Sequence, residues 1–184
     1  LEIGEGTVIR EGVTIHRGTL GRGIGRTIVG KNCLLMAYVH IGHDCVLGDR
    51  VIMANNASVA GHVVVGDYAN FGGYSGVPQF RSIGENTHIA AMSLVTKDVP
   101  AFMTVAGNPA SAVGLNLEGM RRRDFSTDAL AALKESHKIV YRSGLTKNKA
   151  LNRLAELRSK YSEVEKFARS IESSESGIIR GRSH

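Results

Sequence analysis

A six-residue repeat is the feature of this chain that most constrains its fold. From Val29 to Val95 an apolar residue stands at every sixth position, and the next residue is Gly or Ala in nine of the twelve repeats. An α-helix repeats about every 3.6 residues and cannot hold these positions on one face. A period of six is instead typical of a parallel β-helix, whose interior the apolar residues fill. The twelve residues are Val29, Leu35, Ile41, Leu47, Met53, Val59, Val65, Phe71, Val77, Ile83, Ile89 and Val95.

The residues before Val29 follow the same period in another frame. Ile3, Ile9 and Ile15 are six positions apart, but their series is two residues out of phase with the later one. We therefore predict that residues 18–27, "GTLGRGIGRT", form a loop that leaves the solenoid. The repeat is already running at Leu1, and because solenoids need capped ends we expect further coils to precede this sequence.

The repeat fades after Val99, and helical spacing replaces it. Ser126 is a suitable N-cap for a helix that Gly144 would end, and two further helices are expected over about 147–160 and 162–173. The tail "SSESGIIRGRSH", residues 173–184, is expected to be poorly ordered. We therefore divide the chain into a β-helix over residues 1–113 and a helical domain over residues 114–184.

Composition narrows the class of protein. The net charge of +6 favours an acidic or anionic partner, whereas the absence of Trp and the 5% aromatic content argue against nucleic acid. Cys33 and Cys45 fall at small inward positions of the repeat and do not make a disulfide framework. No stretch approaches the roughly 18 apolar residues of a transmembrane segment, and no signal peptide opens the chain, so we expect a cytoplasmic protein.

Polar residues gather on one face once the repeat is stacked. If three hexapeptides make one coil, each residue lies beneath the residue eighteen positions later, about 4.8 Å away. His43 then lies beneath Gly61, Gly61 beneath Gln79, and Asp44 beneath His62. The segment "HIGHDC" therefore contributes to a compact polar patch.

The patch suits general base catalysis. Histidine has an ordinary pKa of about 6.5, close to working pH. Asp44, or a nearby backbone carbonyl, would fix the tautomer of His43, and Gly61, which lacks a Cβ, would bring its N–H close to a developing oxyanion. These groups fit transfer of an acyl group to a hydroxyl without a covalent enzyme intermediate.

Two other interpretations of the histidines are open. His40, His43 and His62 are possible zinc ligands, as in the gamma-type carbonic anhydrases, which are also hexapeptide-repeat proteins. Their usual pair is spaced His-x4-His, whereas this chain has His-x2-His, and we predict no metal. In the second interpretation, the histidines have no role and are solvated surface residues of a non-catalytic solenoid.

Matching motifs begin with "VTIHRGT" (13–19) and end with "GLNLEGMRRRDFS" (114–126). Together with the segments between them, they resemble a family of enzymes, the UDP-N-acetylglucosamine O-acyltransferases that open lipid A biosynthesis. The resemblance covers nearly the whole chain, and "TIHRGT" together with "NLEGMRRRDFS" argues against the related N-acyltransferase of the same pathway. The main alternative is another hexapeptide-repeat acyltransferase, for example one that acts on a 3-amino sugar nucleotide. Pro78 departs from the family pattern, which commonly has His before Gln-Phe. The segments are "VTIHRGT" (13–19), "LLMAYVHIGHDC" (34–45), "ANNASVAGHV" (54–63), "PQF" (78–80), "GNPA" (107–110) and "GLNLEGMRRRDFS" (114–126).

The resemblance implies a mainly β protein, with a left-handed parallel β-helix and a small C-terminal helical domain. It also implies a homotrimer with active sites between subunits. The acyl donor would be a (R)-3-hydroxyacyl group on acyl carrier protein, carried by its phosphopantetheine, and the acceptor the 3-hydroxyl of UDP-N-acetylglucosamine. The family uses no further bound cofactor. The sequence leaves open the chain length, the hydroxyl preference and the choice between an oxygen and a nitrogen acceptor.

The family's roles at the polar patch transfer residue by residue. His43 would deprotonate the sugar hydroxyl, with support from Asp44, and Gly61 would donate its N–H to the oxyanion. The residues that would line the sugar and acyl-chain site are His40, His62 and Gln79.

Further roles fall outside the patch. Asn116, Glu118 and Arg122 would bind the nucleotide end, where a guanidinium suits a diphosphate because it makes paired hydrogen bonds. Ala91 would set the acyl-chain length, and Met92 is the nearest alternative stop because its flexible side chain can fold into a groove.

Overall fold

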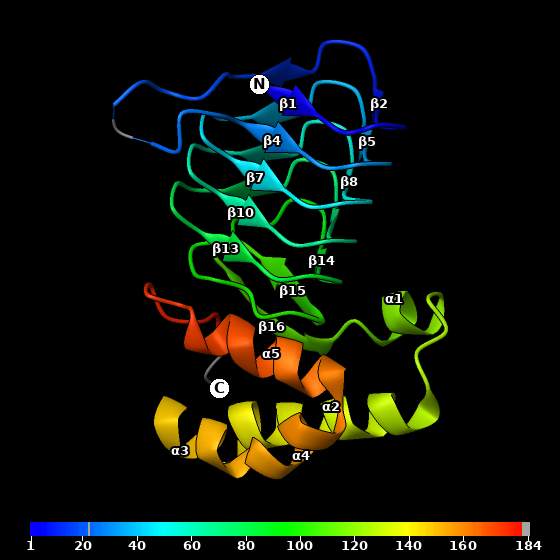
Figure 1. The fold of residues 1–184 in the computed structure, drawn as a ribbon, viewed down its shortest axis with the longest axis vertical. Coiled ribbons are helices and arrows are strands. Elements are labelled where there is room, and N and C mark those ends of the chain that lie inside the picture. The colour runs from blue at the N-terminus through cyan, green and yellow to red at the C-terminus, as the bar shows by residue number, and fades with distance from the viewer. Residues whose placement is uncertain (22, 182–184) are drawn as a thin grey trace.

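The computed structural model describes residues 1–21 and 23–181, which form a parallel β-solenoid with helices packed against its C-terminal end (Figure 1). Most strands contain two residues, and each complete coil contributes one strand to each of three sheets. The strands of the coils are β1 (Glu2–Ile3), β2 (Val8–Ile9), β3 (Thr14–Ile15), β4 (Ile28–Val29), β5 (Leu34–Leu35), β6 (His40–Ile41), β7 (Val46–Leu47), β8 (Ile52–Met53), β9 (Ser58–Val59), β10 (Val64–Val65), β11 (Asn70–Phe71), β12 (Gly76–Val77), β13 (Ser82–Ile83) and β14 (His88–Ile89).

The three sheets are named here after one strand of each. The β4 sheet has the order β1-β4-β7-β10-β13, and the β6 sheet has the order β12-β9-β6-β3. The β8 sheet has the order β16-β15-β14-β11-β8-β5-β2 and therefore includes two strands from beyond the coils. All pairings between the coil strands are parallel, as the hexapeptide period predicts.

The pairing register confirms the eighteen-residue coil. His40 pairs with Ser58, and Ile52 pairs with Asn70, so each pair is eighteen positions apart. Thr14 pairs with His40, which is 26 positions away, or eight more than the regular spacing. The eight extra residues lie between β3 and β4, so the loop predicted at residues 18–27 does leave the solenoid.

The solenoid core consists of the repeat's apolar residues. All twelve are at most 4% exposed, from Leu35 at 0% to Val77 at 4%. Cys33 and Cys45 are also buried and carry free thiols, as predicted. Because a β-strand alternates its side chains between two faces, the second residue of each strand points inward and the first faces outward.

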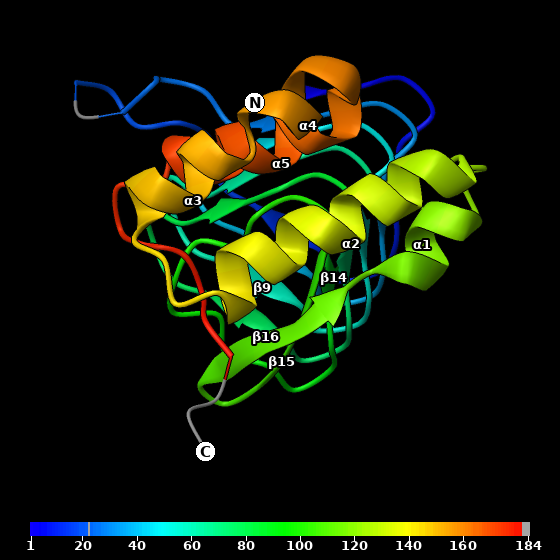
Figure 2. The ribbon, with the colours of Figure 1, turned by 90° about the horizontal axis from the view of Figure 1, so that it is seen from below.

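Among the described residues, a hairpin and five helices follow the coils, and Figure 2 shows the helices lying across the end of the solenoid. The sequence did not predict the hairpin, whose first strand β15 pairs with β14 and extends the β8 sheet. In residues 1–21 and 23–181 the helices are all too short or too polar to span a bilayer. The elements are β15 (Met103–Gly107), β16 (Ala110–Leu115), α1 (Leu117–Arg121), α2 (Thr127–Arg142), α3 (Lys147–Arg153), α4 (Ala155–Lys160) and α5 (Ser162–Glu172).

Helix α2 begins where the sequence predicts. Ser126 is its N-cap, and the Ser126 hydroxyl accepts a hydrogen bond from the Ala129 N–H. The prediction of a single helix over about 147–160 is wrong. The structure has two separate helices there, α3 and α4, which meet at the buried Leu154. The Leu154 N–H is shared between the carbonyls of Ala150 and Leu151, which tightens the chain there.

The expectation of a poorly ordered tail is also wrong for the described part of it. The Ile179 N–H donates to the Asp98 carbonyl, and the Asp98 N–H donates to the Gly177 carbonyl. Ile179 is only 3% exposed. The tail is held because it pairs with backbone groups of the last coil and buries an apolar side chain there. Residues 182–184 of the predicted tail lie outside the described residues.

Strand β10 offers a matched test of the core, because it holds two valines with opposite exposure. Val65 is 2% exposed and Val64 is 48% exposed. We expect Val65→Ala to lower the free energy of unfolding by about 2 kcal/mol, through lost burial and the cavity left behind. Val64→Ala should change it by less than about 0.5 kcal/mol. Urea unfolding of both variants measures this, and equal losses would contradict the inward and outward assignment.

Candidate active site

His43 and Asp44 occupy the turn that joins β6 to β7, at the corner between the β6 and β4 sheets. The His43 Nδ1 lies 2.9 Å from the Asp44 Oδ2. The Asp44 side chain is fully buried, whereas the His43 side chain is 32% exposed. The pair therefore places a fixed carboxylate behind a histidine that solvent or a substrate can reach.

The loop that leaves the solenoid encloses the Asp44 carboxylate. The Thr19 hydroxyl donates to Asp44 Oδ2 at 2.6 Å, and the Thr19 N–H donates to the same oxygen at 3.0 Å. The Gly25 N–H donates to Oδ1 at 3.0 Å. A Cβ on Gly23 would lie 2.4 Å from the carboxylate, so only glycine fits there. This glycine-rich loop thus surrounds a carboxylate of its own chain.

The sequence alone did not assign a role to Thr19. The available signal was the change of frame, which showed that residues 18–27 leave the solenoid. A change of frame does not say toward which corner the loop folds, because that depends on hydrogen bonds formed only after the coils have stacked. Thr19 is therefore a positioning residue that the tertiary structure adds to the predicted pair.

These contacts decide the charge of Asp44 and the tautomer of His43. The Thr19 hydroxyl holds the pKa of Asp44 well below its usual range, assisted by His43 and by the N–H groups of Thr19 and Gly25, against the opposing effect of burial. Because the carboxylate is ionised, it can only accept, so the His43 Nδ1 carries the proton. In the neutral tautomer that this contact selects, the lone pair is on the His43 Nε2, as a general base requires.

Gly61 and His62 lie one coil away from this pair. A Cβ on Gly61 would lie 2.7 Å from both Cε1 and Nε2 of His43, so a side chain there would displace the imidazole. The rings of His43 and His62 are perpendicular, with centroids 4.9 Å apart. His62 in turn stacks on Phe80 at 4.7 Å. The corner thus brings together the base, its carboxylate and the backbone of Gly61.

Other predicted residues lie around this corner. His40 is in β6, where its Nδ1 lies 2.8 Å from the Thr14 hydroxyl and its ring contacts His16 edge-on at 4.8 Å. Burial lowers the pKa of His40, with a further contribution from His16. Gln79 is exposed one coil beyond Gly61. The structure therefore places both near the His43 corner.

The two residues predicted to set the chain length lie at a different corner. Ala91 and Met92 are in the turn after β14, between the β8 and β6 sheets, and Met92 is 69% exposed. The same corner carries Tyr74, which is 65% exposed one coil earlier. Their role in chain length stays a prediction.

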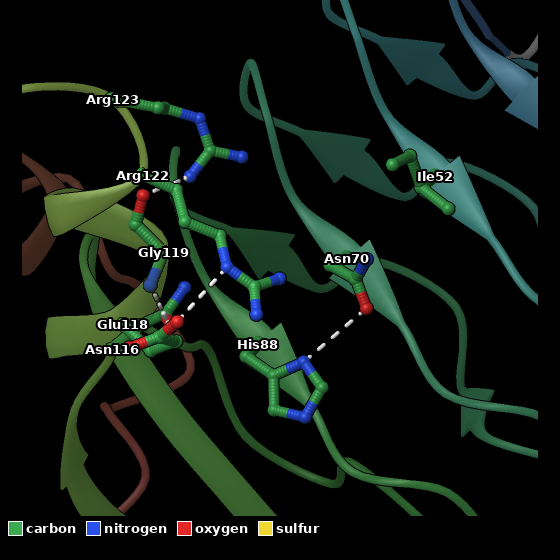
Figure 3. Close-up of a pocket in the computed structure, with 8 residues that line it drawn as sticks. All are labelled: Ile52, Asn70, His88, Asn116, Glu118, Gly119, Arg122 and Arg123. Atoms are coloured by element: carbon green, nitrogen blue, oxygen red, sulfur yellow. Dashed lines mark hydrogen bonds and ion pairs between the residues drawn. The ribbon is translucent and has the colours of Figure 1, made fainter.

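The three residues predicted for the nucleotide end, Asn116, Glu118 and Arg122, line one pocket on the outer face of the β8 sheet (Figure 3). The pocket has a volume of about 460 Å³. Sequence reasoning missed the residues of the sheet that line it, although the eighteen-residue stacking places them in one column. The lining residues are Ile52, Asn70, His88, Asn116, Glu118, Gly119, Arg122 and Arg123.

Helix α1 presents the polar groups of this pocket. Asn116 caps the helix, because its Oδ1 accepts from the Gly119 N–H at 3.0 Å while its Nδ2 donates to the Asn86 carbonyl at 2.9 Å. Arg122 and Glu118 form an exposed ion pair across one helical turn, with Nε and Oε1 2.9 Å apart. Asn116 therefore positions α1, whereas the guanidinium of Arg122 is open to a ligand.

Arg123 fixes α1 to the solenoid. Its guanidinium donates to the Gly119 carbonyl at 2.7 Å and to the Tyr68 carbonyl at 3.3 Å, and it lies 4.6 Å from the centre of the Tyr68 ring. Burial lowers the pKa of Arg123. This combination of hydrogen bonds and a cation–π contact holds the pocket wall in place.

The two groups of predicted residues are not brought together within one chain. The coils have three faces, and the His43 corner joins the β6 and β4 sheets, whereas the pocket predicted for the nucleotide end lies on the β8 sheet. In a three-sided solenoid that corner is opposite that face. A single substrate that contacts both groups therefore needs a second copy of the chain.

The described residues contain one group of three side chains that is close enough to hold a metal ion. The ligand atoms of His43, Asp44 and His62 lie within 4.8 Å of one another. The Asp44 oxygens, however, already accept from four donors, which are the hydroxyl and N–H of Thr19, the Gly25 N–H and His43. This arrangement favours a clamped carboxylate over a metal ligand.

Comparisons with known proteins agree with this architecture. Residues 98–179 match the family model of UDP-N-acetylglucosamine O-acyltransferase domain 2, and residues 26–61 match the bacterial transferase hexapeptide model. The acyl-[acyl-carrier-protein]–UDP-N-acetylglucosamine O-acyltransferase of Ectopseudomonas mendocina is 50% identical over 180 residues, which are 98% of this chain and 69% of the relative. The chain belongs to the UDP-N-acetylglucosamine O-acyltransferase family.

Solved structures of the family have the same fold. The enzyme from Moraxella catarrhalis is 46% identical and superposes with a TM-score of 0.94 over 97% of this chain and 69% of that one. The UDP-N-acetylglucosamine acyltransferase from Campylobacter jejuni is 40% identical, with a TM-score of 0.92 over 98% and 70% of the two chains. The residues that match domain 2, 98–179, include the β15–β16 hairpin and all five of the helices described above.

Thr19 can be tested as a positioning residue by removing its hydroxyl alone. We expect Thr19→Val to lower kcat about tenfold with little change in KM for the sugar nucleotide, because His43 loses its fixed partner while binding groups remain. Thr19→Ser keeps a hydroxyl and should restore most of the rate. Steady-state kinetics of the two variants measure this, and equal rates would show that the hydroxyl is dispensable.

The same variant should change the acid response of stability. The folded-state pKa of Asp44 is lowered, so its ionised form stabilises the fold above the unfolded value of about 3.9, and this contribution is lost as pH falls toward the folded value. Thr19→Val reduces the shift. Its free energy of unfolding should therefore fall less between about pH 6 and pH 3 than that of the parent. Urea unfolding of the parent and of Thr19→Val between about pH 6 and pH 3 measures this difference, and equal losses in the two proteins would contradict it.

Proposed function

We propose that this protein transfers a 3-hydroxyacyl group from acyl carrier protein to the 3-hydroxyl of UDP-N-acetylglucosamine. Family membership supports the reaction class, since the Ectopseudomonas mendocina relative is named as an O-acyltransferase between acyl-[acyl-carrier-protein] and UDP-N-acetylglucosamine. The observation that carries the proposal is the His43 corner, where a clamped carboxylate leaves Nε2 free as a base. As the sequence predicts, the reaction would take place in the cytoplasm and need no bound cofactor.

The geometry supports a direct transfer. The His43 Nε2 takes the proton of the sugar hydroxyl as the hydroxyl oxygen attacks the thioester carbonyl. The carbonyl oxygen becomes an oxyanion, which the Gly61 N–H stabilises. The intermediate then collapses, the C–S bond breaks, and the imidazolium returns its proton to the departing thiolate. Asp44 stabilises the imidazolium between these steps because its carboxylate stays ionised.

The remaining predicted residues have roles in binding. Arg122 would pair with the diphosphate, and Glu118 and Asn116 would contact or position the nucleotide end. Ala91 and Met92 are the candidates that limit the acyl chain. The donor's carrier protein would dock on basic groups of the chain, whose net charge of +6 suits an acidic partner.

A homotrimer is the assembly that completes this site. The His43 corner of one chain would meet the β8-sheet pocket of the next, a head-to-tail contact that closes into a ring. Exposed apolar side chains on the corners fit such a contact, including Tyr38 at 63%, Tyr74 at 65% and Phe80 at 62% exposure. Each of the three sites would then draw on two subunits.

The reaction is tested with purified protein, UDP-N-acetylglucosamine and a panel of 3-hydroxyacyl carrier proteins. We expect transfer by the parent and a loss of at least about 10²-fold in kcat for His43→Ala, with an unchanged melting temperature, because a positioned base is worth that much. A His43→Ala variant that turns over within a few-fold of the parent would contradict the assignment of the base.

The same purified protein can be used to test the alternative that the histidines bind zinc. If the histidines act as bases and not as ligands, dialysis against a strong chelator leaves the rate unchanged. One zinc per chain in elemental analysis, together with carbon dioxide hydration, would instead support the carbonic anhydrase function.

The shared site is tested by mixing two inactive chains. We expect His43→Ala and Arg122→Ala each to be nearly inactive, while their co-expressed mixture regains about one quarter of the parent rate, because that fraction of sites pairs an intact His43 with an intact Arg122. Each variant expressed alone is the control. A mixture no more active than its components would place the whole site within one chain.

A further inference from the structure

The nucleotide pocket contains a histidine to which the family resemblance gives no role. Ile52, Asn70 and His88 stand at the same register in three successive coils, so they form one column on the outer face of the β8 sheet. All three line the pocket beneath α1 (Figure 3). Their side chains are half-buried in the single chain. The column therefore faces whatever ligand Arg122 binds.

The neighbour of His88 fixes its tautomer. The His88 Nδ1 lies 3.2 Å from the Asn70 Oδ1. An amide oxygen can only accept, so Nδ1 carries a proton. Burial lowers the pKa of His88, which keeps the ring neutral at neutral pH. A neutral ring with its proton on Nδ1 presents Nε2 as a hydrogen-bond acceptor, for which the described residues offer no donor.

The position of the Arg122 charge suggests how a nucleotide would lie in the pocket, with its phosphates at Arg122 and its base toward His88. Arg122 reaches over the sheet from α1 and is exposed, so it is free to pair with phosphate. The Arg123 guanidinium already donates hydrogen bonds to the Gly119 and Tyr68 carbonyls, so it holds α1 against the solenoid. His88 and Ile52 belong to the sheet side of the pocket, where an acceptor and an apolar surface suit the edge and face of a base.

We propose that the His88 Nε2 accepts a hydrogen bond from the N3–H group of uracil, and that this contact selects uridine over cytidine nucleotides. Uracil carries a proton on N3, whereas the N3 of cytosine is an acceptor. A cytidine nucleotide would therefore set two acceptors against each other and leave both unpaired, which is costly in a partly buried site. This inference rests on the proposed function, because it assumes that the pocket holds the nucleotide end of the substrate.

Calorimetric titration of the full chain with UDP and with CDP tests the proposal. We expect the parent to bind UDP at least about tenfold more tightly than CDP, the effect of one hydrogen bond gained against one acceptor left unpaired. His88→Leu should weaken UDP binding about tenfold and leave CDP binding unchanged or slightly tighter, because the clash of two acceptors is gone, so the two affinities converge. His137→Gln is the control, because His137 is a half-buried histidine on α2, in another pocket.

A second variant separates recognition from support of the fold. Asn70→Asp places a carboxylate beside Nδ1 and favours the charged ring, whose Nε2 then donates a proton. We expect the preference for UDP to shrink or to reverse toward CDP, which loss of structure alone would not produce. An unchanged ratio of the two affinities in His88→Leu overturns the inference, whatever Asn70→Asp shows.

The outcomes also separate this inference from the function on which it rests. If the parent acylates UDP-N-acetylglucosamine and His88→Leu keeps the parent's UDP to CDP ratio, the function stands and the role of His88 is wrong. If the parent binds neither nucleotide and transfers no acyl group to the sugar nucleotide, both proposals are overturned.

Discussion

The backbone hydrogen bonds between coils fix everything else in this structure. Each coil of eighteen residues sets its strands in register with the next, so that residues eighteen positions apart become neighbours in space. The turns continue the same ladder, where the His62 N–H donates to the His43 carbonyl at 2.9 Å. His62 has a positive φ of 61° and Asp44 one of 59°. Such backbone is unfavourable for residues with a Cβ, and the ladder holds it in place.

A departure from this register creates the support of the candidate base. The eight extra residues between β3 and β4 cannot stay in the solenoid without breaking its frame, so the chain leaves it there and brings Thr19, Gly23 and Gly25 against the adjacent corner. There the loop supplies Thr19 and Gly25 as donors to a carboxylate that would otherwise be buried without enough partners. The same contacts order the loop and fix the proton on the Nδ1 of His43, so loop structure and base chemistry depend on each other.

The two groups of candidate functional residues lie on different sides of the solenoid. The His43 corner carries the candidate base and its carboxylate, while the opposite face carries α1, the two arginines that follow it, and the column of Ile52, Asn70 and His88. A rigid three-sided rod cannot fold these surfaces toward each other, so a substrate that contacts both has to lie between copies of the chain. Assembly is therefore part of the proposed function.

The sequence by itself determined the solenoid, its register and its core, because a period of six over twelve repeats leaves few other structures possible. It also placed His43, Asp44, Gly61 and His62 at one corner, since stacking follows from counting residues. The β15–β16 hairpin, the break between α3 and α4 and the packed tail were decided by tertiary structure, which supplies the partners of their backbone groups. The same holds for Thr19 and His88. Their contacts depend on where a loop and a helix fold back against the coils, and the hexapeptide period contains no information about either path.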